Sequence, residues 1–251
     1  NILVSNDDGI WAPGIHALAT ALRKIAGVTV VAPHAEQSTS GHSLTLHKPL
    51  RVEEVKESFY SVNGTPADCI YMALKHILPN KPDLVVTGVN RGGNLGNDIH
   101  YSGTVAGARE AAFDGIPSIA VSAFSKDRRA EYKFEVAAEF ACEIAQVVMR
   151  EGLPEGVLIN VNVPSVDTKK EVRGVRVCST GHRIYSEEVV ENKDPRGKSY
   201  FWIGGDYQGF RDTPNSDCKA LDEDYIAITP LHVDATEHRF LDKVQQWKIN
   251  I

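Results

Sequence analysis

Cysteine is scarce in this chain, and the few cysteines show no pairing motif. The chain has four of them, at positions 69, 142, 178 and 218, and none forms a C-x-x-C motif. Their spacings match neither a zinc site nor a disulfide framework. This usage favours a reducing compartment, so we expect a cytoplasmic protein. The histidines also lack the spacing of a His-based metal site.

Long apolar runs and an excess of positive charge are absent as well. No stretch reaches the roughly 18 apolar residues of a membrane span, and the chain starts directly in a strand-like pattern. We therefore expect no membrane segment and no signal peptide. The net charge of −6 argues against a broad surface for DNA or RNA. To bind a phosphate, so acidic a chain needs a local source of positive charge, such as a metal ion or a helix N-terminus.

What the chain does contain is an alternation of strand-like and helix-like segments. Strands are predicted at 2–5, 28–32, 83–90, 118–122 and 157–164, where the residues are apolar and often β-branched. Helices are predicted at 15–25, from Thr65 to about 77, at 102–114 and at 131–151. Strands that alternate with helices indicate an α/β fold with a Rossmann-like, doubly wound and mostly parallel sheet.

The pattern changes after Pro164. Hairpin strands are predicted at 175–179, 187–191 and 200–203, followed by a returning strand at 224–231 and a helix at 235–248. With 251 residues, the length allows one or two domains. We therefore predict a Rossmann-like catalytic core at 1–165 and a smaller part, with the hairpin and the last helix, at 166–251.

Polar residues follow three of the predicted strands. Asn6, Asp7 and Asp8 follow the first strand, a polar loop at 32–43 follows the second, and a Gly-rich loop at 90–104 follows the strand at 83–90. In open parallel sheets, ligands bind outside the carboxyl ends of the strands. If the three strands are neighbours, these loops converge on one crevice.

The adjacent carboxylates Asp7 and Asp8 have two readings. An isolated Asp-Asp pair commonly forms a turn or caps a helix. Two carboxylates without a cation repel each other, however, and these two lie at the edge where ligands bind. With a hydroxyl and an amide oxygen they form a hard-oxygen set, which suits Mg²⁺ or Mn²⁺ better than Zn²⁺.

The Gly-rich loop at 90–104 has the composition of an anion site. Its glycines let the backbone approach a ligand closely, and Asn94 and Asp98 supply polar groups. Ser102, Gly103 and Thr104 begin a helix, where free N–H groups favour an anion. An ordinary serine N-cap beside a Gly-rich turn would account for the same residues without any ligand. The lysine of a P-loop is also missing.

Several long segments of the chain resemble one known family. They are N-D-D-G-I (6–10), S-T-S-G-H-S (38–43), G-T-P-A-D-C (64–69) and V-N-R-G-G-N-L-G-N-D-I-H-Y-S-G-T-V (89–105). Shorter matches follow at 194–197, 200–204 and 225–231. On these segments the sequence resembles the stationary-phase survival protein SurE family of metal-dependent nucleotidases, and the likeness extends over nearly the whole chain.

The resemblance implies a site and an activity. It places one divalent metal ion per subunit, Mg²⁺ or Mn²⁺, on Asp7, Asp8, Ser38 and Asn90. It places the substrate phosphate at Asn94, Ser102, Gly103 and Thr104. It also implies removal of phosphate from nucleoside 5′- or 3′-monophosphates, and in some members from short polyphosphate. Family subunits form homodimers, often homotetramers, through the C-terminal part.

These residues lead to one mechanistic hypothesis and several alternatives. In the hypothesis, a water molecule activated by the metal or by Asp7 and Asp8 attacks the phosphorus in line. A covalent aspartyl intermediate is a weaker alternative, because Gly9 and Ile10 stand where the haloacid-dehalogenase pattern requires an acid. A nucleotide-binding or assembly protein without turnover is the alternative from another class. A receiver-type switch domain fits the length poorly.

Overall fold

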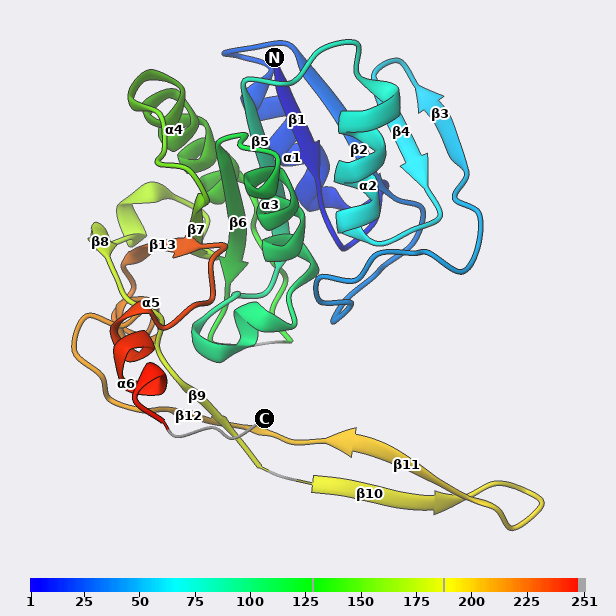
Figure 1. Ribbon diagram of the computed structural model, residues 1–251, viewed down its shortest axis with the longest axis vertical. Coiled ribbons are helices and arrows are strands. Elements are labelled where there is room, and N and C mark those ends of the chain that lie inside the picture. Colours follow the sequence, from blue (N-terminus) through cyan, green and yellow to red (C-terminus); the bar gives the residue numbers. More distant parts are fainter. Residues whose placement is uncertain (128, 187, 248–251) are drawn as a thin grey trace.

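A nine-stranded sheet forms the centre of the computed structural model, which describes residues 1–127, 129–186 and 188–247 (Figure 1). The strand order is β3-β4-β2-β1-β5-β6-β7-β13-β8. In that order the strands span Val52–Lys56, Phe59–Val62, Val28–Pro33, Ile2–Ser5, Leu84–Arg91, Ser118–Phe124, Val157–Pro164, Ile226–His232 and Val175–Val177. All neighbours from β4 to β7 pair in parallel, whereas β3 and β13 run antiparallel to the strands they join, β4 and β7.

Helices cover both faces of the sheet. The covering helices are α1 (Pro13–Leu22), α2 (Pro66–Met72), α3 (Gly103–Phe113) and α4 (Glu135–Glu151). Two short helices, α5 (Asp217–Asp222) and α6 (Leu241–Gln245), follow in the C-terminal part of the chain. Alternate residues of a strand point to opposite faces, so Ile2 and Val4 share a core with α1 and α4, while Leu3 packs in a core with α2. Ala120 of β6 lies in a third core with α3. The α/β class and the doubly wound, mostly parallel sheet are thus confirmed.

Local sequence sets the helix starts near the site. Thr65 caps α2 through a capping box: its hydroxyl accepts the N–H of Asp68, and the Asp68 carboxylate accepts the N–H of Thr65. Ser102 caps α3, with its Oγ accepting the N–H of Val105 at 3.1 Å. Gly115, at φ +72°, follows the end of α3.

Short helical turns complete the described chain. A π-helical turn, η1 (Ala73–Ile77), continues α2, and 3₁₀ turns lie at η2 (Gly96–His100), η3 (Lys169–Glu171) and η4 (His238–Phe240). Among them η2 matters most for the site, because it lies in the loop between β5 and α3.

The hairpin region differs in part from the sequence prediction. β10 (Glu188–Lys193) and β11 (Ser199–Gly204) form the expected antiparallel hairpin, although the predicted start at position 187 lies outside the described residues. The segment at 175–179 is not a hairpin strand, since β8 joins the edge of the central sheet parallel to β13. A second antiparallel pair, β9 (Arg183–Tyr185) with β12 (Tyr207–Phe210), was not predicted.

Three further elements differ from the sequence prediction. The described part of the predicted helix at 235–248 contains only η4 and the short α6, and the apolar residues Phe240, Leu241 and Trp247 are exposed there. Without a core to pack on, a long helix gains little stability. Helix α4 begins at Glu135 rather than at 131. The hairpin of β3 and β4 was not predicted at all.

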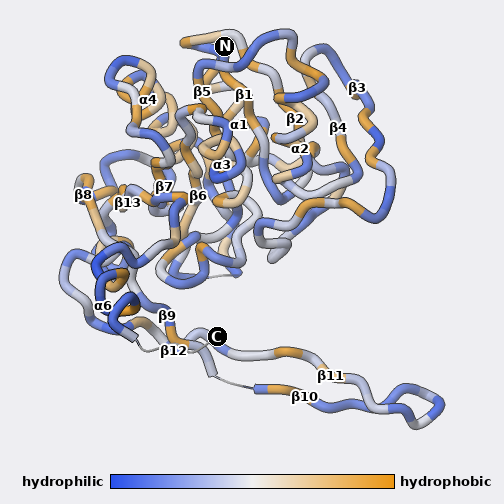
Figure 2. The backbone as a smooth tube through the Cα atoms, viewed as in Figure 1, coloured by the Kyte–Doolittle hydropathy of each residue, from blue (hydrophilic) through white to orange (hydrophobic). Residues whose placement is uncertain are grey.

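The β10–β11 hairpin extends away from the rest of the molecule as a long arm (Figure 1). Apolar segments lie on both of its strands (Figure 2). Its large exposed side chains are Val189, Val190, Tyr200, Phe201, Trp202 and Ile203. Within the described residues, no helix is long and apolar enough to cross a membrane.

Candidate active site

A pocket of about 820 Å³, lined mainly by polar and charged residues, opens at the carboxyl ends of β1, β5 and β6. The loops that follow β1, β2 and β5 meet at this pocket, as predicted from the sequence, because these three strands are adjacent and parallel. The end of β6 adds Phe124 and Ser125. The pocket is lined by Asp7, Ser38, Thr39, Asn90, Arg91, Gly92, Gly93, Asn94, Asp98, Tyr101, Ser102, Phe124, Ser125, Tyr132, Arg183, Tyr185 and Ile203. It therefore holds both predicted groups of site residues, apart from Asp8, Gly103 and Thr104.

Asp7 is the most buried carboxylate of the pocket, with 4% of its surface exposed. Its Oδ1 accepts a hydrogen bond of 2.5 Å from the hydroxyl of Thr104, at the first turn of α3. Burial, with a smaller contribution from the charge of Asp8, raises the pKa of Asp7 to about 6, although hydrogen bonds from Thr104 oppose the rise. The charged form of Asp7 is thus costly in the absence of a cation.

Asp8 lies beside the pocket and is partly buried. Its Oδ2 accepts the backbone N–H of Arg91 at 3.1 Å, which ties the loop after β1 to the end of β5. Burial raises the pKa of Asp8, and the charge of Glu36 contributes to the rise. Two neighbouring carboxylates with raised pKa values fit a bound cation, because a cation would stabilise both charges.

The turn that presents this carboxylate pair is built by two residues of the N-D-D-G motif. The amide of Asn6 both donates to the carbonyl of Gly9 at 2.9 Å and accepts its N–H at 3.2 Å. Gly9 has φ +101°, a conformation that other residues rarely adopt. Turn formation thus falls to Asn6 and Gly9, which frees both carboxylates for another role.

Ser38 and Asn90 bring neutral oxygens to the same pocket. The Ser38 hydroxyl is exposed and donates to Glu36 at 2.6 Å. The Asn90 amide nitrogen donates to the Gly92 carbonyl at 2.7 Å, and its Oδ1 accepts no hydrogen bond from the described residues. No three His, Cys, Asp or Glu side chains of the described residues form a metal-type group. The donor set is therefore two carboxylates with hydroxyl and amide oxygens, which suits Mg²⁺ or Mn²⁺.

The start of α3 lies directly against the carboxylates. A Cβ added at Gly103 would lie 2.8 Å from the Cβ of Asp7, so only glycine allows this close approach. The hydroxyl of Thr104, which we expected to face a phosphate, donates to Asp7 instead, and the backbone of Thr104 also lowers the pKa of that carboxylate. The positive end of α3 thus stabilises Asp7 in part.

Asn94 is held by amide side chains that the sequence analysis missed. Its backbone N–H donates to Asn162 Oδ1 at 2.8 Å, and its carbonyl accepts from Asn160 and Asn162 at 2.9 and 3.0 Å. Its side-chain nitrogen donates to Ser122 at 2.8 Å. The signal was present as I-N-V-N in β7, where two asparagines share one face of a buried strand.

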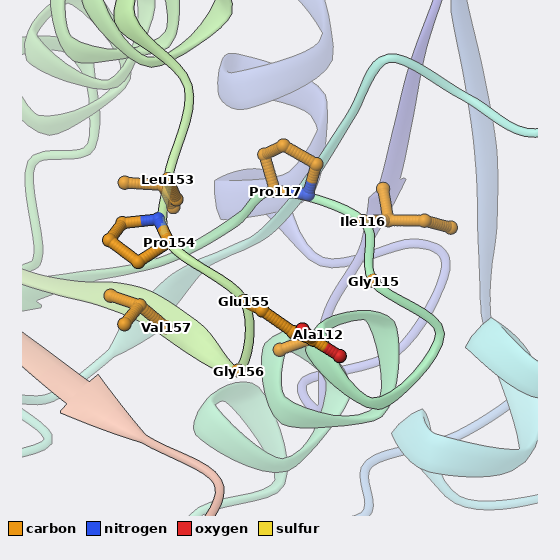
Figure 3. Close-up of a pocket in the computed structure, with 9 residues that line it drawn as sticks. All are labelled: Ala112, Gly115, Ile116, Pro117, Leu153, Pro154, Glu155, Gly156 and Val157. Carbon is orange, nitrogen blue, oxygen red and sulfur yellow. The ribbon is translucent and has the colours of Figure 1, made fainter.

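A second, smaller pocket of about 290 Å³ lies at the opposite end of the strands, by the amino ends of β6 and β7. It is formed by the end of α3 and by the segments that precede β6 and β7 (Figure 3). Glu155 is its only ionisable lining residue, and the other lining residues are Ala112, Gly115, Ile116, Pro117, Leu153, Pro154, Gly156 and Val157. It offers no group of ligands comparable to those of the first pocket.

The fold and the first pocket define a class of protein: a Rossmann-like α/β protein with a carboxylate-lined site at the carboxyl edge of its sheet. Comparison with known proteins shows that the chain belongs to the survival protein SurE family, whose model matches residues 2–187. The resemblance noted in the sequence is thereby confirmed.

Individual relatives match over almost their whole length. A 5′-nucleotidase SurE of Geobacter sulfurreducens is 48% identical over 250 residues, which is 100% of this chain and 94% of that protein. A 5′-nucleotidase SurE of Pelobacter propionicus is 47% identical, with 98% and 99% covered. The crystal structure of a SurE protein from Aquifex aeolicus superposes with a TM-score of 0.86, at 42% identity and with 97% and 98% covered.

Proposed function

We propose that this chain is a 5′-nucleotidase that depends on one divalent metal ion, Mg²⁺ or Mn²⁺, per subunit. The observation that carries the proposal is the adjacent pair Asp7–Asp8, whose pKa values are both raised. Asp7 is buried in the pocket against the start of α3, and the partly buried Asp8 lies beside it. The names of the relatives support the same reaction.

Four residues would hold the metal ion. Asp7 and Asp8 supply charged oxygens, Ser38 supplies a hydroxyl, and Asn90 supplies its unengaged Oδ1. When bound, such an ion polarises a phosphate oxygen and makes a coordinated water more acidic. Thr104 acts on this set indirectly, because its hydroxyl fixes the orientation of Asp7.

The remaining site residues would bind the phosphate. Asn94 is positioned by Ser122 and by the asparagines of β7, so its side chain is preorganised. Ser102 and the backbone of Gly103 present the first turn of α3, where an anion is stabilised. Asp7 or Asp8 then orients and deprotonates the attacking water, which displaces the nucleoside oxygen in line.

The walls of the pocket favour a nucleotide among phosphate esters. Four aromatic side chains line it: Tyr101, Phe124, Tyr132 and Tyr185. Aromatic faces stack well on nucleobases, at about 1–3 kcal/mol per base. We extend the proposal to 3′-monophosphates and to short polyphosphate, as the family resemblance implies.

Self-association through the C-terminal part belongs to the same proposal. The β10–β11 arm exposes apolar residues on both of its faces: Val189, Phe201 and Ile203 on one, Val190, Tyr200 and Trp202 on the other. A two-stranded hairpin without a packing partner is marginally stable in water. A second copy of the chain would cover it, which makes residues 1–165 the catalytic core and 166–251 the oligomerisation part of a homodimer or homotetramer. We place this assembly in the cytoplasm.

Phosphate release tests the function. Chelator-stripped protein is assayed with a panel of nucleoside 5′- and 3′-monophosphates, before and after addition of Mg²⁺, Mn²⁺ or Zn²⁺. The proposal predicts release that requires Mg²⁺ or Mn²⁺. Folded protein that binds nucleotides tightly and releases no phosphate with any metal would instead support the alternative, a nucleotide-binding or assembly protein.

A further inference from the structure

Asp98 is a carboxylate of the pocket that neither the metal set nor the phosphate set uses. It lies in η2, four residues from Asn94 and four from Ser102, and it lines the same pocket as both. Its side chain is 23% exposed, so it is neither a surface charge nor a core residue. A bound nucleotide that placed its phosphate at Asn94 and Ser102 would extend through the pocket that Asp98 lines.

The Asp98 carboxylate is fixed by partners from β9. Its Oδ2 accepts hydrogen bonds from Nη1 of Arg183, at 2.7 Å, and from the hydroxyl of Tyr185. Arg183 is itself only 7% exposed, and its guanidinium lies 4.6 Å from the centre of the Tyr207 ring. The backbone N–H of Arg183 also donates to Asn97 at 2.9 Å. The orientation of Asp98 is therefore set before any ligand binds.

The other oxygen of this carboxylate is available. Oδ1 of Asp98 accepts no hydrogen bond from the described residues, although Oδ2 accepts two. A carboxylate oxygen accepts hydrogen bonds and repels a second anion, so its natural ligand is a neutral donor such as a hydroxyl. In a nucleoside monophosphate the hydroxyl donors are those of the sugar.

We infer that Asp98, held by Arg183 and Tyr185, accepts a hydrogen bond from the ribose hydroxyls of the substrate and thereby selects ribonucleotides. The inference rests on the proposed nucleotidase function. A hydrogen bond to a charged group contributes enough to change affinity about 10- to 100-fold. Because Asp98 is partly exposed to water, the lower end of this range is expected.

A similar ion pair elsewhere in the chain provides a control. Arg176 pairs with Glu223 at 2.7 Å, and its guanidinium lies 3.6 Å from the centre of the Tyr225 ring. The chemistry matches that of Asp98 and Arg183, but neither Arg176 nor Glu223 lines the pocket. Loss of the Glu223 charge should therefore leave substrate choice unchanged.

The test compares kcat/KM for a ribonucleoside 5′-monophosphate with its 2′-deoxy and 3′-deoxy analogues, in wild type, Asp98→Asn and Glu223→Gln. Phenyl phosphate, which has no sugar, reports on the phosphate site alone. Wild type and Glu223→Gln should prefer the ribonucleotide about tenfold over at least one deoxy analogue. In Asp98→Asn this preference should fall towards one, and kcat/KM should fall by a larger factor for the ribonucleotide than for phenyl phosphate.

The outcomes separate this inference from the proposed function. Equal rates with ribo and deoxy substrates in wild type, or an unchanged preference in Asp98→Asn, would overturn the inference and leave the nucleotidase intact. No release from any phosphate ester would instead overturn the function. If Asp98→Asn does not fold, Tyr185→Phe, which loses the hydroxyl that donates to Asp98, must reduce the same preference; an unchanged preference there would count against the inference.

Discussion

At the carboxyl ends of β1, β5 and β6 the loops carry carboxylates, amides and a helix start, whereas the segments before β6 and β7 carry small and apolar residues with Glu155 alone. Both edges belong to one sheet and both form pockets. Only at the carboxyl edge do several strands deliver polar side chains to one point, beside the positive end of α3. A pocket alone therefore does not indicate a functional site. Polar side chains that converge in it, with perturbed pKa values, do.

Removal of the Asp7 charge should cause the largest loss of activity, because it takes a charged ligand from the pocket at the carboxyl ends of the strands. Asp7→Asn keeps the size of the side chain but loses a charged oxygen next to the phosphate position. We expect kcat/KM for a nucleoside 5′-monophosphate to fall by at least about 10²–10³-fold with saturating Mn²⁺. Retention of more than a tenth of the wild-type turnover would contradict the role given to Asp7.

The same carboxylate should make the metal-free protein sensitive to pH. The pKa of Asp7 is about 6 in the folded state and has an ordinary value of 3.8. Between pH 3.8 and 6 the folded state therefore binds more protons than the unfolded state. Stability should thus be greatest below pH 4 as far as Asp7 is concerned, and should decrease by about 3 kcal/mol as the pH rises through 6. Urea unfolding of chelator-stripped protein between pH 3.5 and 8 measures the slope of this decrease.

Asp7→Asn should flatten that slope and leave the metal-free variant more stable than wild type at pH 8. Asp8 acts in the same direction, because its pKa is also raised, so some slope should remain. An unchanged slope in Asp7→Asn would show that the charge of Asp7 does not oppose folding.

The close approach of α3 to the carboxylates gives the next largest effect. In Gly103→Ala the added methyl would lie 2.8 Å from the Cβ of Asp7, so the helix start or the carboxylate has to move. A misplacement of this size costs about 10²-fold in kcat. Gly204→Ala is the matched control, since its methyl meets nothing closer than 3.6 Å. Equal activity of the two variants would show that the reaction does not depend on the close contact between Gly103 and Asp7.

The amino edge should show the smallest effect. Glu155 is exposed and makes no hydrogen bond or ion pair among the described residues. Glu155→Gln should therefore change the free energy of unfolding by less than about 0.5 kcal/mol and leave kcat/KM unchanged. A loss of activity in this variant would mean that the second pocket takes part in the reaction.

The sequence predicted elements well where local signals and burial agree. The strand at 2–5 and the strand at 157–164 were predicted to the residue, because each is a short apolar run buried on both faces. The helix at 102–114 was predicted from its serine cap and its terminal glycine. The last helix was predicted too long: of the described residues in that range only Leu241–Gln245 are α-helical, because their apolar side chains have no core to pack on.

The site was predictable in its residues but not in its contacts. The carboxylate pair and the Gly-rich loop stood out, since strand order brings such loops to one edge. That Thr104 bonds to Asp7, and that Asn160 and Asn162 hold Asn94, depends on the three-dimensional packing of strands far apart in the chain. The same holds for Arg183, which reaches Asp98 from 85 residues away.

Metal binding itself tests the central claim most directly. Mn²⁺ is titrated into chelator-stripped wild type and Asp7→Asn, and bound ion is counted by electron paramagnetic resonance or calorimetry. We predict one Mn²⁺ per wild-type chain and a loss of at least about tenfold in affinity in the variant, because a charged ligand is removed. Equal stoichiometry and affinity in the two proteins would contradict the assignment of the carboxylate edge as the cation site.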